Sequence, residues 1–486
     1  MYTKIKAQIG SGLKAKIISG LFWNFIGTLI SKGLIFFAFI YIARIISIED
    51  YGKIGIIRSF ILTFTLLSLG SLGATATKYL AIYKDIDKKN ASKILSLNRV
   101  VVLFISIAIL IFLLSLSKSI AKNFFGDITL STDVQISAVA IFFSALNGLQ
   151  TGALSGLEKF KEISYLNMIN GTLTIPLLIF TAKYYGVRGV TSGLMLTNFL
   201  LWLTSAYILM KVVKKEKIYF TLRDLKNEFQ ILKDFSLPSF LGSLMISPIV
   251  LLCNAMLVHS TNGFTKMGIY NAAFNYSTIV LTMITIWAQV LYPYSMKMYD
   301  KNNKKFEFIN IISPLITGIF LCLPLLVFPD FFSNIFGSKY ASDDMFATTT
   351  FVAMFTIVIG YGQGISINFA AGNYMWWNLL HNFVWGLLSL IFCKLLIHMG
   401  AKGRALAFLL SYVATALIFL RLYIHKKIAS RNLLVNWYIF YVIVILIVCS
   451  SFFYLYPNLI IRICLLLLAY FLFIKVFKKW WIDFVN

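Results

Sequence analysis

Three polar residues stand four positions apart within the apolar stretch of residues 19–43: Asn24, Thr28 and Lys32. Side chains at this spacing project from one face of an α-helix. A charge at the middle of a bilayer costs roughly 2.5–3.5 kcal/mol on insertion scales. Lys32 therefore either faces a water-filled cavity, where its ammonium group can bind an anion, or extends its long side chain to the membrane interface. Because Lys32 lies far from both ends of the stretch, we predict that it faces a cavity.

Arg58 is a second cation within an apolar stretch. A guanidinium group presents two parallel N–H donors that match the oxygens of a phosphate. Arg58 also lies close to the expected outer end of its stretch, so a cavity and an interfacial position both remain open for it. If both cations face one cavity, that cavity suits an anionic ligand.

A longer polar row runs along residues 268–296, where Asn, Thr and Gln recur at steps of three and four. This period places the row on one side of a helix. We predict a stripe that faces water, with interhelical hydrogen bonding as the alternative. The preceding apolar stretch, residues 235–258, adds one further asparagine. The predicted polar lining of the cavity comprises Asn24, Thr28, Asn254, Asn271, Asn275, Thr278, Thr282 and Gln289.

The positions of the acidic and sulfur-containing residues restrict the chemistry. All 18 Asp and Glu residues fall in predicted loops or at helix ends. Proton-driven exporters of cations typically use a carboxylate within the membrane, and the sequence predicts none. The five cysteines are scattered through apolar runs, without a CxxC pair or a histidine at metal-ligand spacing. We therefore expect the cysteines to be packing residues, and neither a metal nor a cofactor is predicted.

Composition decides the broad class of protein. Of the 486 residues, 59% are hydrophobic and 13% are charged, and the apolar residues form runs of about 20, the length that crosses a bilayer. The sequence therefore predicts an all-α polytopic membrane protein. The first apolar run is too long for a cleavable signal peptide and is expected to be the first span. Basic cytoplasmic loops account for the net charge of +26, and no basic folded domain is present that could bind nucleic acid.

The apolar runs give about 14 candidate spans. When the N-terminus is placed inside, the predicted cytoplasmic segments hold most of the 44 Lys and Arg residues, so both termini are expected in the cytoplasm. The longest segment between spans divides the chain near its middle, as in transporters built from two repeats. The expected parts are a basic N-terminus (1–16), an N-lobe of six spans (17–212), a linker (213–234), a C-lobe of six spans (235–425) and a final helix pair with the C-terminus (426–486).

Several short sequences now suggest a family. Residues 43–81, "ARIISIEDYGKIGIIRSFILTFTLLSLGSLGATATKYLA", resemble the opening of polysaccharide flippases, the Wzx-type O-antigen and capsule transporters of the multidrug/oligosaccharidyl-lipid/polysaccharide exporter superfamily. Further matches are "GLEKFKEISYLN" (156–167), "GVRGV" (186–190), "MGIYNAAF" (267–274) and "LYP" (291–293). Their order and spacing cover nearly the whole chain.

The resemblance implies a V-shaped pair of six-helix lobes, with a helix pair appended, that works by alternating access. The cargo would be an oligosaccharide repeat unit linked to undecaprenyl pyrophosphate, moved from the cytoplasmic to the periplasmic leaflet of the bacterial inner membrane. Cations in the cavity would meet the pyrophosphate, and the matching positions here are Lys32, Arg58 and Lys78. A polysaccharide polymerase and chain-length machinery would be further partners, and a monomer suffices because one chain supplies both lobes.

Other functions remain open. A flippase of lipid-linked peptidoglycan precursors would use the same chemistry, and a small-molecule exporter of the same superfamily would share the fold. A membrane glycosyltransferase or polymerase is a different class, since the pair Glu49-Asp50 resembles the acidic residues of such enzymes. That pair is better explained as a helix-capping turn, and no large outer domain is predicted. We therefore expect a transporter and no enzyme.

Overall fold

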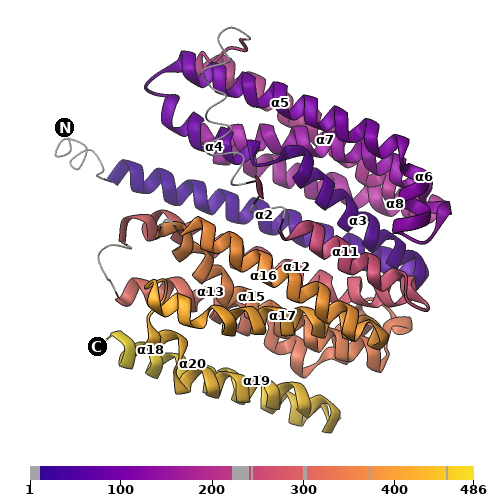
Figure 1. Cartoon of the computed structure of the whole chain (residues 1–486), viewed down its shortest axis with the longest axis vertical. Helices are drawn as coiled ribbons and strands as arrows, with labels where there is room; N and C mark the ends of the chain where they lie inside the picture. Colours follow the sequence, from indigo (N-terminus) through magenta and orange to yellow (C-terminus); the bar gives the residue numbers. More distant parts are fainter. Residues whose placement is uncertain are drawn as a thin grey trace. The chain divides into compact units, whose positions relative to one another are not determined.

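A computed structural model describes residues 11–221, 240–241, 245–298, 304–372, 374–455 and 458–485. Every regular element in this part of the chain is a helix (Figure 1). Eleven stretches are long and apolar enough to cross a membrane. Two of them, Phe160–Glu216 with 57 residues and Trp376–His425 with 50 residues, can each cross twice, since about 20 residues span the hydrocarbon. The predicted all-α, multi-pass class is confirmed, and the count of about 14 spans stays a prediction.

The chain forms two compact units. One comprises Met1–Ile42 and Ile56–Ser247, and the other comprises Ala43–Gly55 and Pro248–Asn486. The short segment Ala43–Gly55 therefore packs with the second half of the chain, although it follows the first predicted span. Most of the predicted linker 213–234 lies outside the described residues.

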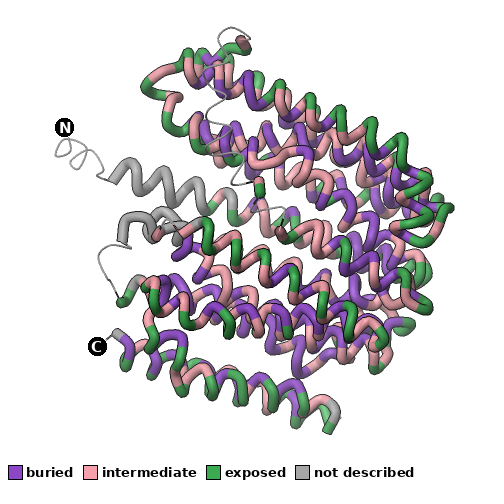
Figure 2. The backbone as a smooth tube through the Cα atoms, in the orientation of Figure 1, coloured by how far each residue is buried: buried purple, intermediate pink, exposed green. Residues whose placement is uncertain are grey.

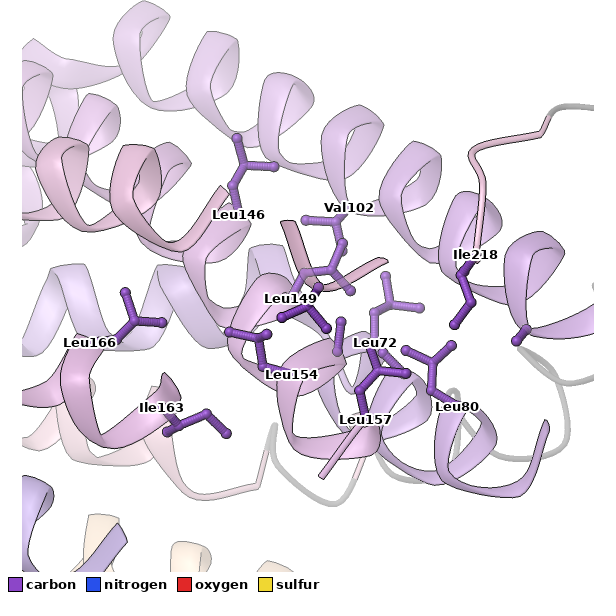
Figure 3. Close-up of a cluster of buried hydrophobic side chains, with 14 of the residues drawn as sticks. Leu72, Leu80, Val102, Leu146, Leu149, Leu154, Leu157, Ile163, Leu166 and Ile218 are labelled. Atoms are coloured by element: carbon purple, nitrogen blue, oxygen red, sulfur yellow. The ribbon is translucent and has the colours of Figure 1, made fainter. Parts of the chain in front are cut away.

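The first unit is built around one central helix, α7. The elements of this unit are α2 (Ser11–Ile45), α3 (Ile48–Leu69), α4 (Leu72–Tyr83), α5 (Lys88–Ser115), α6 (Ser117–Ser119), the turns η1 (Ile120–Phe124) and η2 (Ile128–Leu130), α7 (Ser131–Gly156) and α8 (Phe160–Glu216). Helix α7 packs against α4, α5 and α8. Between them lies a core of aliphatic side chains that includes Leu72, Leu80, Leu149 and Leu154 (Figure 3).

Glycine lets α4 and α7 approach closely. A Cβ atom on Gly152 of α7 would lie 2.4 Å from the carbonyl oxygen of Gly73 on α4. At this contact the Thr77 hydroxyl donates a hydrogen bond of 2.8 Å to the Gly152 carbonyl oxygen. Helices within a membrane associate through such small residues and hydrogen bonds, because burial against lipid tails gives no hydrophobic gain.

Two glycines interrupt predicted helical stretches. Residues 54–80 form one apolar stretch in the sequence but two helices in the structure, because the chain turns at Gly70, where φ is +55°, before α4 begins. Helix α8 is interrupted at Gly186, which has φ +56° and ψ −131°. Only glycine adopts such angles without a steric penalty from Cβ.

The second unit is organised around α15. The elements of this half are α11 (Ser247–Val258), α12 (Gly263–Met298), α13 (Lys304–Val327), α14 (Pro329–Ile335), η6 (Ser338–Tyr340), α15 (Asp343–Ala371), α16 (Met375–Leu396), η7 (Ile397–Met399), α17 (Gly400–His425), α18 (Arg431–Leu434), α19 (Trp437–Leu455) and α20 (Leu459–Val485). Helix α15 packs against α12, α13 and α17, and the final pair α19 and α20 packs against α13.

A buried ion pair holds the final helix pair in place. The Arg462 side chain of α20 is only 3% exposed, and its two terminal nitrogens contact both oxygens of Asp330 on α14 at 2.7–3.2 Å. The guanidinium carbon also lies 5.0 Å from the ring centroids of Phe328 and Phe453. A bidentate contact of this kind fixes orientation as well as proximity.

Exposed residues follow the helices along their length (Figure 2), and many of these residues are large and apolar. On α5, Phe104 is 74% exposed, and on α20, Leu467 is 63% exposed. In water such surfaces would promote aggregation. Such surfaces are compatible with lipid tails, which offer no hydrogen-bond partners. The helices satisfy their own backbone groups, and their apolar side chains face the lipid.

The segment Ala43–Gly55 carries the "EDYG" sequence, and its contacts explain these residue types. The Ser47 hydroxyl accepts a hydrogen bond of 3.0 Å from the Asp50 amide and donates one of 2.8 Å to the Asp50 carboxylate, which caps the start of α3. The Tyr51 side chain is buried, and its hydroxyl oxygen accepts a 2.6 Å hydrogen bond from Asn275 on α12. A Cβ on Gly52 would lie 1.8 Å from the Phe264 carbonyl oxygen, so only glycine fits there.

This contact predicts that Gly52→Ala destabilises the protein. The added methyl group must displace the backbone at Phe264, at a cost of about 3 kcal/mol or more. The measurement is the midpoint of thermal unfolding of the purified protein in detergent. Gly362→Ala in α15 is the matched control, because nothing lies within 4 Å of its Cβ position and alanine favours a helix. Equal midpoints for the two variants would contradict the prediction.

Candidate functional site

The structure brings two of the predicted cations together in the first unit. Lys32 and Phe39 lie two turns apart on α2, which places them on the same side of that helix. Arg58 of α3 stacks on the Phe39 ring, with its guanidinium carbon 3.7 Å from the ring centroid. Phe39 is buried, Arg58 is half-buried and Lys32 is exposed. The arginine is thereby held against a fixed aromatic surface, an arrangement that stabilises a cation in an apolar setting.

The electrostatics of this pair favour an anion. The charge of Arg58 acts on Lys32, and no acidic residue in the described part of the chain does so. Two like charges held near each other repel, and neighbouring protein atoms remove part of the water around the Lys32 ammonium group. An anion with several oxygens relieves both effects, because it can accept hydrogen bonds from the ammonium group and from the guanidinium fork.

Contacts with α8 hold α2 in its rotational position. The Ser164 hydroxyl donates a 2.8 Å hydrogen bond to the carbonyl oxygen of Trp23, and the Asn167 amide donates one of 3.2 Å to the Thr28 hydroxyl. A Cβ on Gly171 would lie 2.8 Å from the Cα of Ser31, so the two backbones are in close contact. Thr28 thus takes part in an interhelical hydrogen bond, and the side chain of Asn24 lies outside the described residues.

Helix α3 continues the polar line that starts at Arg58. Thr65 follows Arg58 by two turns, and Ser68 follows Thr65 by one. The hydroxyl oxygens of both are buried without a hydrogen-bond partner. Lys78 lies beyond the break at Gly70, on α4, where its side chain is exposed and its ammonium group sits 5.3 Å from the ring centroid of Tyr79.

The predicted stripe on α12 changes character along its length. Asn271 and Asn275 are buried, and Asn275 donates to Tyr51 as described above, so the N-terminal part of the stripe belongs to the packed interior. Thr278 and Thr282 are half-buried, and each donates to the carbonyl oxygen four residues earlier. Thr285 is exposed, and the side chain of Gln289 lies outside the described residues. Interhelical bonding, the alternative interpretation, therefore applies to Asn275.

Asn254 also differs from its predicted position in a cavity lining. It is buried on α11, and its amide oxygen accepts hydrogen bonds of 3.0 and 3.3 Å from Arg404 on α17. The sequence analysis missed Arg404, because this arginine follows the sequence GAKG at a helix start and looks like an interfacial residue. It also missed Phe39, which the seven-residue spacing from Lys32 could have indicated.

One acidic side chain is buried in the part of the chain that the structure describes. Asp133 is 3% exposed and lies in the first turn of α7, so its position at a helix end is as predicted and its burial is not. It lies near Thr191 of α8. Within the same residues, no three His, Cys, Asp or Glu side chains gather as a metal site would require.

Comparison with known proteins identifies one family. The family model described as "Polysaccharide biosynthesis protein" matches residues 17–299. No curated protein sequence matches the chain significantly.

Several solved structures share the fold at low sequence identity. The lipid II flippase MurJ in an inward closed conformation aligns with a TM-score of 0.67 and 19% identity, over 94% of this chain and 98% of that protein. An inward-facing multidrug resistance MATE family transporter of the MOP superfamily aligns with a TM-score of 0.69 and 15% identity, over 82% and 94%. A MOP superfamily transporter from Pyrococcus furiosus, described as having a binding pocket of reverse polarity, aligns at 0.63 and 18%, over 84% and 95%.

The site predicts that inorganic pyrophosphate binds the purified protein and that Lys32→Gln weakens binding. Loss of one charged hydrogen-bond donor corresponds to about 1.5–3 kcal/mol, or roughly a 10- to 100-fold rise in Kd. Titration calorimetry at low salt measures this directly. Lys183→Gln is the control, because Lys183 is an exposed lysine of α8 whose ammonium group lies over Tyr184. A similar Kd for both variants would show that the Lys32 site does not bind the anion.

Proposed function

The chain belongs to the polysaccharide biosynthesis protein family, and from this premise we propose that it moves oligosaccharide repeat units, linked to undecaprenyl pyrophosphate, from the cytoplasmic to the periplasmic leaflet of the bacterial inner membrane. The repeat units would serve O-antigen, capsule or exopolysaccharide assembly. The observation that carries the proposal is the pair Lys32 and Arg58, held together on α2 and α3 with Arg58 stacked on Phe39.

The chemistry of the pair fits the pyrophosphate of such a cargo. Arg58 offers a planar fork to two oxygens, and the Phe39 ring limits the planes that the fork can adopt. Lys32 offers a point charge from the neighbouring helix. A neutral lipid headgroup would offer these two cations no negative charge, so the pair favours an anionic headgroup.

The polar groups near the pair suit a sugar chain. Thr65 and Ser68 continue from Arg58 along α3, and their hydroxyl groups lack a hydrogen-bond partner. Hydroxyl groups both donate and accept hydrogen bonds, as sugar hydroxyls do. We propose that these residues, together with Lys78 as a third cation, contact the cargo during alternating access of an N-lobe (17–212) and a C-lobe (235–425).

The remaining features of the proposal rest on the sequence. The excess of Lys and Arg in the predicted inner loops supports cytoplasmic termini. One chain supplies both lobes, so we propose a monomer, and a polysaccharide polymerase with its chain-length machinery would receive the flipped repeat unit. The Ser47 hydroxyl caps α3 and donates a hydrogen bond to the Asp50 carboxylate, which supports a transporter over a glycosyltransferase that uses this acid.

A flippase of lipid-linked peptidoglycan precursors is the second candidate. It would use the same anion site, and the fold similarity to the lipid II flippase MurJ extends over 94% of this chain, against 82% for the multidrug transporter. The two candidates differ in what the cell loses: a surface glycan in the first case, and the cell wall in the second.

Deletion of the gene in its source bacterium, followed by complementation, tests the function. We expect the deletion strain to accumulate the pyrophosphate-linked oligosaccharide and to lose surface glycan, because the repeat unit stays in the inner leaflet. Wild type should restore both, and Lys32→Ala should not. Lipid extraction with mass spectrometry and a surface-glycan stain are the measurements.

Lys183→Ala serves as the control and should complement as wild type does. Normal lipid pools and normal surface glycan in the deletion strain would rule out the proposed function. Accumulation of the peptidoglycan precursor with lysis would instead identify the second candidate.

A further inference from the structure

A buried cation outside the proposed transport site lies in the second unit. Arg404, in the first turns of α17, has 0% exposure. Its Nε and Nη2 atoms donate to the Asn254 amide oxygen, its guanidinium carbon lies 3.6 Å from the Phe408 ring centroid, and its Nη1 atom has no partner. An amide and a ring are neutral and do not balance the charge. A buried charge without a counter-ion is strongly unfavourable.

The groups around Arg404 narrow the choice of counter-ion. Within the described residues, four ionisable side chains interact electrostatically with Arg404, and none of them is a carboxylate. They are Tyr270, Tyr412, Cys253 and Cys393. Thiols lose their proton about 1.5 pH units more easily than phenols do. Cys393 of α16 lies close enough to Arg404 for each group's charge to act on the other. A thiolate at Cys393 would therefore supply the missing negative charge.

A second thiol lies in contact with the first. Cys253 of α11 and Cys393 of α16 lie beside each other, although 140 positions separate them. The Cys253 sulfur also lies 3.8 Å from the carbonyl oxygen of Ser389, one turn before Cys393. Both thiols have 0% exposure. Cys322 and Cys449 are also buried, and neither has another thiol or a guanidinium group acting on it.

We propose that Cys253 and Cys393 form a redox-active dithiol, in which Cys393 is a thiolate paired with Arg404, and that hydrogen peroxide converts the pair to a disulfide joining α11 to α16. The burial of both sulfurs restricts the oxidant to a small uncharged molecule. A neighbouring guanidinium group stabilises a thiolate, and the thiolate is the nucleophilic form of cysteine.

The reaction balances in two steps. The Cys393 thiolate attacks one peroxide oxygen, the O–O bond breaks, and the products are a sulfenic acid and hydroxide, which takes up a proton to become water. The Cys253 sulfur then attacks the Cys393 sulfur, an S–S bond forms, and the sulfenic oxygen leaves as a second water with the Cys253 proton. Overall, two thiols and one hydrogen peroxide give one disulfide and two waters.

The full-length protein tests the proposal through an internal comparison. The protein is treated with hydrogen peroxide in detergent, unfolded in acid, blocked with N-ethylmaleimide and digested without reductant. We expect a disulfide-linked peptide of Cys253 and Cys393 to appear at least about tenfold faster than Cys322 or Cys449 loses its thiol, because the latter lack a neighbouring cation. Oxidation of the pair at the same rate as Cys322, or no disulfide, would overturn the proposal.

Two variants examine the individual roles. Cys253→Ser removes the second thiol at nearly constant volume, so the sulfenic acid should persist on Cys393. Dimedone, added while the protein is unfolded so that it can reach the sulfur, should then trap this sulfenic acid. Absence of the dimedone adduct would contradict the thiolate assignment. Arg404→Met removes the charge and should slow disulfide formation by roughly tenfold. An unchanged rate in a folded Arg404→Met protein would show that the guanidinium group does not activate Cys393.

Discussion

A positive charge in hydrocarbon must be hydrated, stacked on a ring, paired or neutralised, and this constraint accounts for much of the molecule. Arg462 meets it with a bidentate ion pair to Asp330. Arg58 meets it with the face of Phe39. Arg404 has an amide and a ring, and the structure leaves its charge to be balanced by a neighbouring thiol. The ion pair of Arg462 anchors a helix pair, whereas the roles of Arg58 in binding an anion and of Arg404 in activating a cysteine are those that we propose.

Close packing of helices positions these charges. In the first unit, the glycine contact between α4 and α7 and the hydrogen bonds between α2 and α8 fix the surfaces from which Lys32 and Arg58 project. Helix breaks at Gly70 and Gly186 allow the chain to change direction between packed segments. Small residues and isolated hydrogen bonds replace the hydrophobic effect as the source of specificity within a membrane.

The transport proposal and the dithiol depend on different parts of the chain. The cation pair lies in the unit that contains Ile56–Ser247, and Cys393 and Arg404 lie in the other unit. Arg58 is half-buried and Lys32 exposed, as a group that meets a cargo must be, whereas both thiols and Arg404 are fully enclosed. Exposure thus separates the proposed site for a large lipid-linked ligand from the proposed dithiol, which only a small molecule can reach.

Sequence alone determined the all-α membrane class, because long apolar runs leave a chain no alternative to helices in lipid. It also identified Lys32, whose mid-membrane charge needs an explanation, and the Asp50 cap, which depends on local spacing. Helical periodicity shows which residues share one face of a helix. Only the tertiary structure decided which other helix packs against that face. Asn271 and Asn275 share the period of Thr285, yet Gly55 and Tyr51 cover the first two, while Thr285 stays exposed. The approach of Cys253 to Cys393 and the stacking of Arg58 on Phe39 were likewise decided by tertiary packing, because periodicity records the face of one helix and not the partner on another.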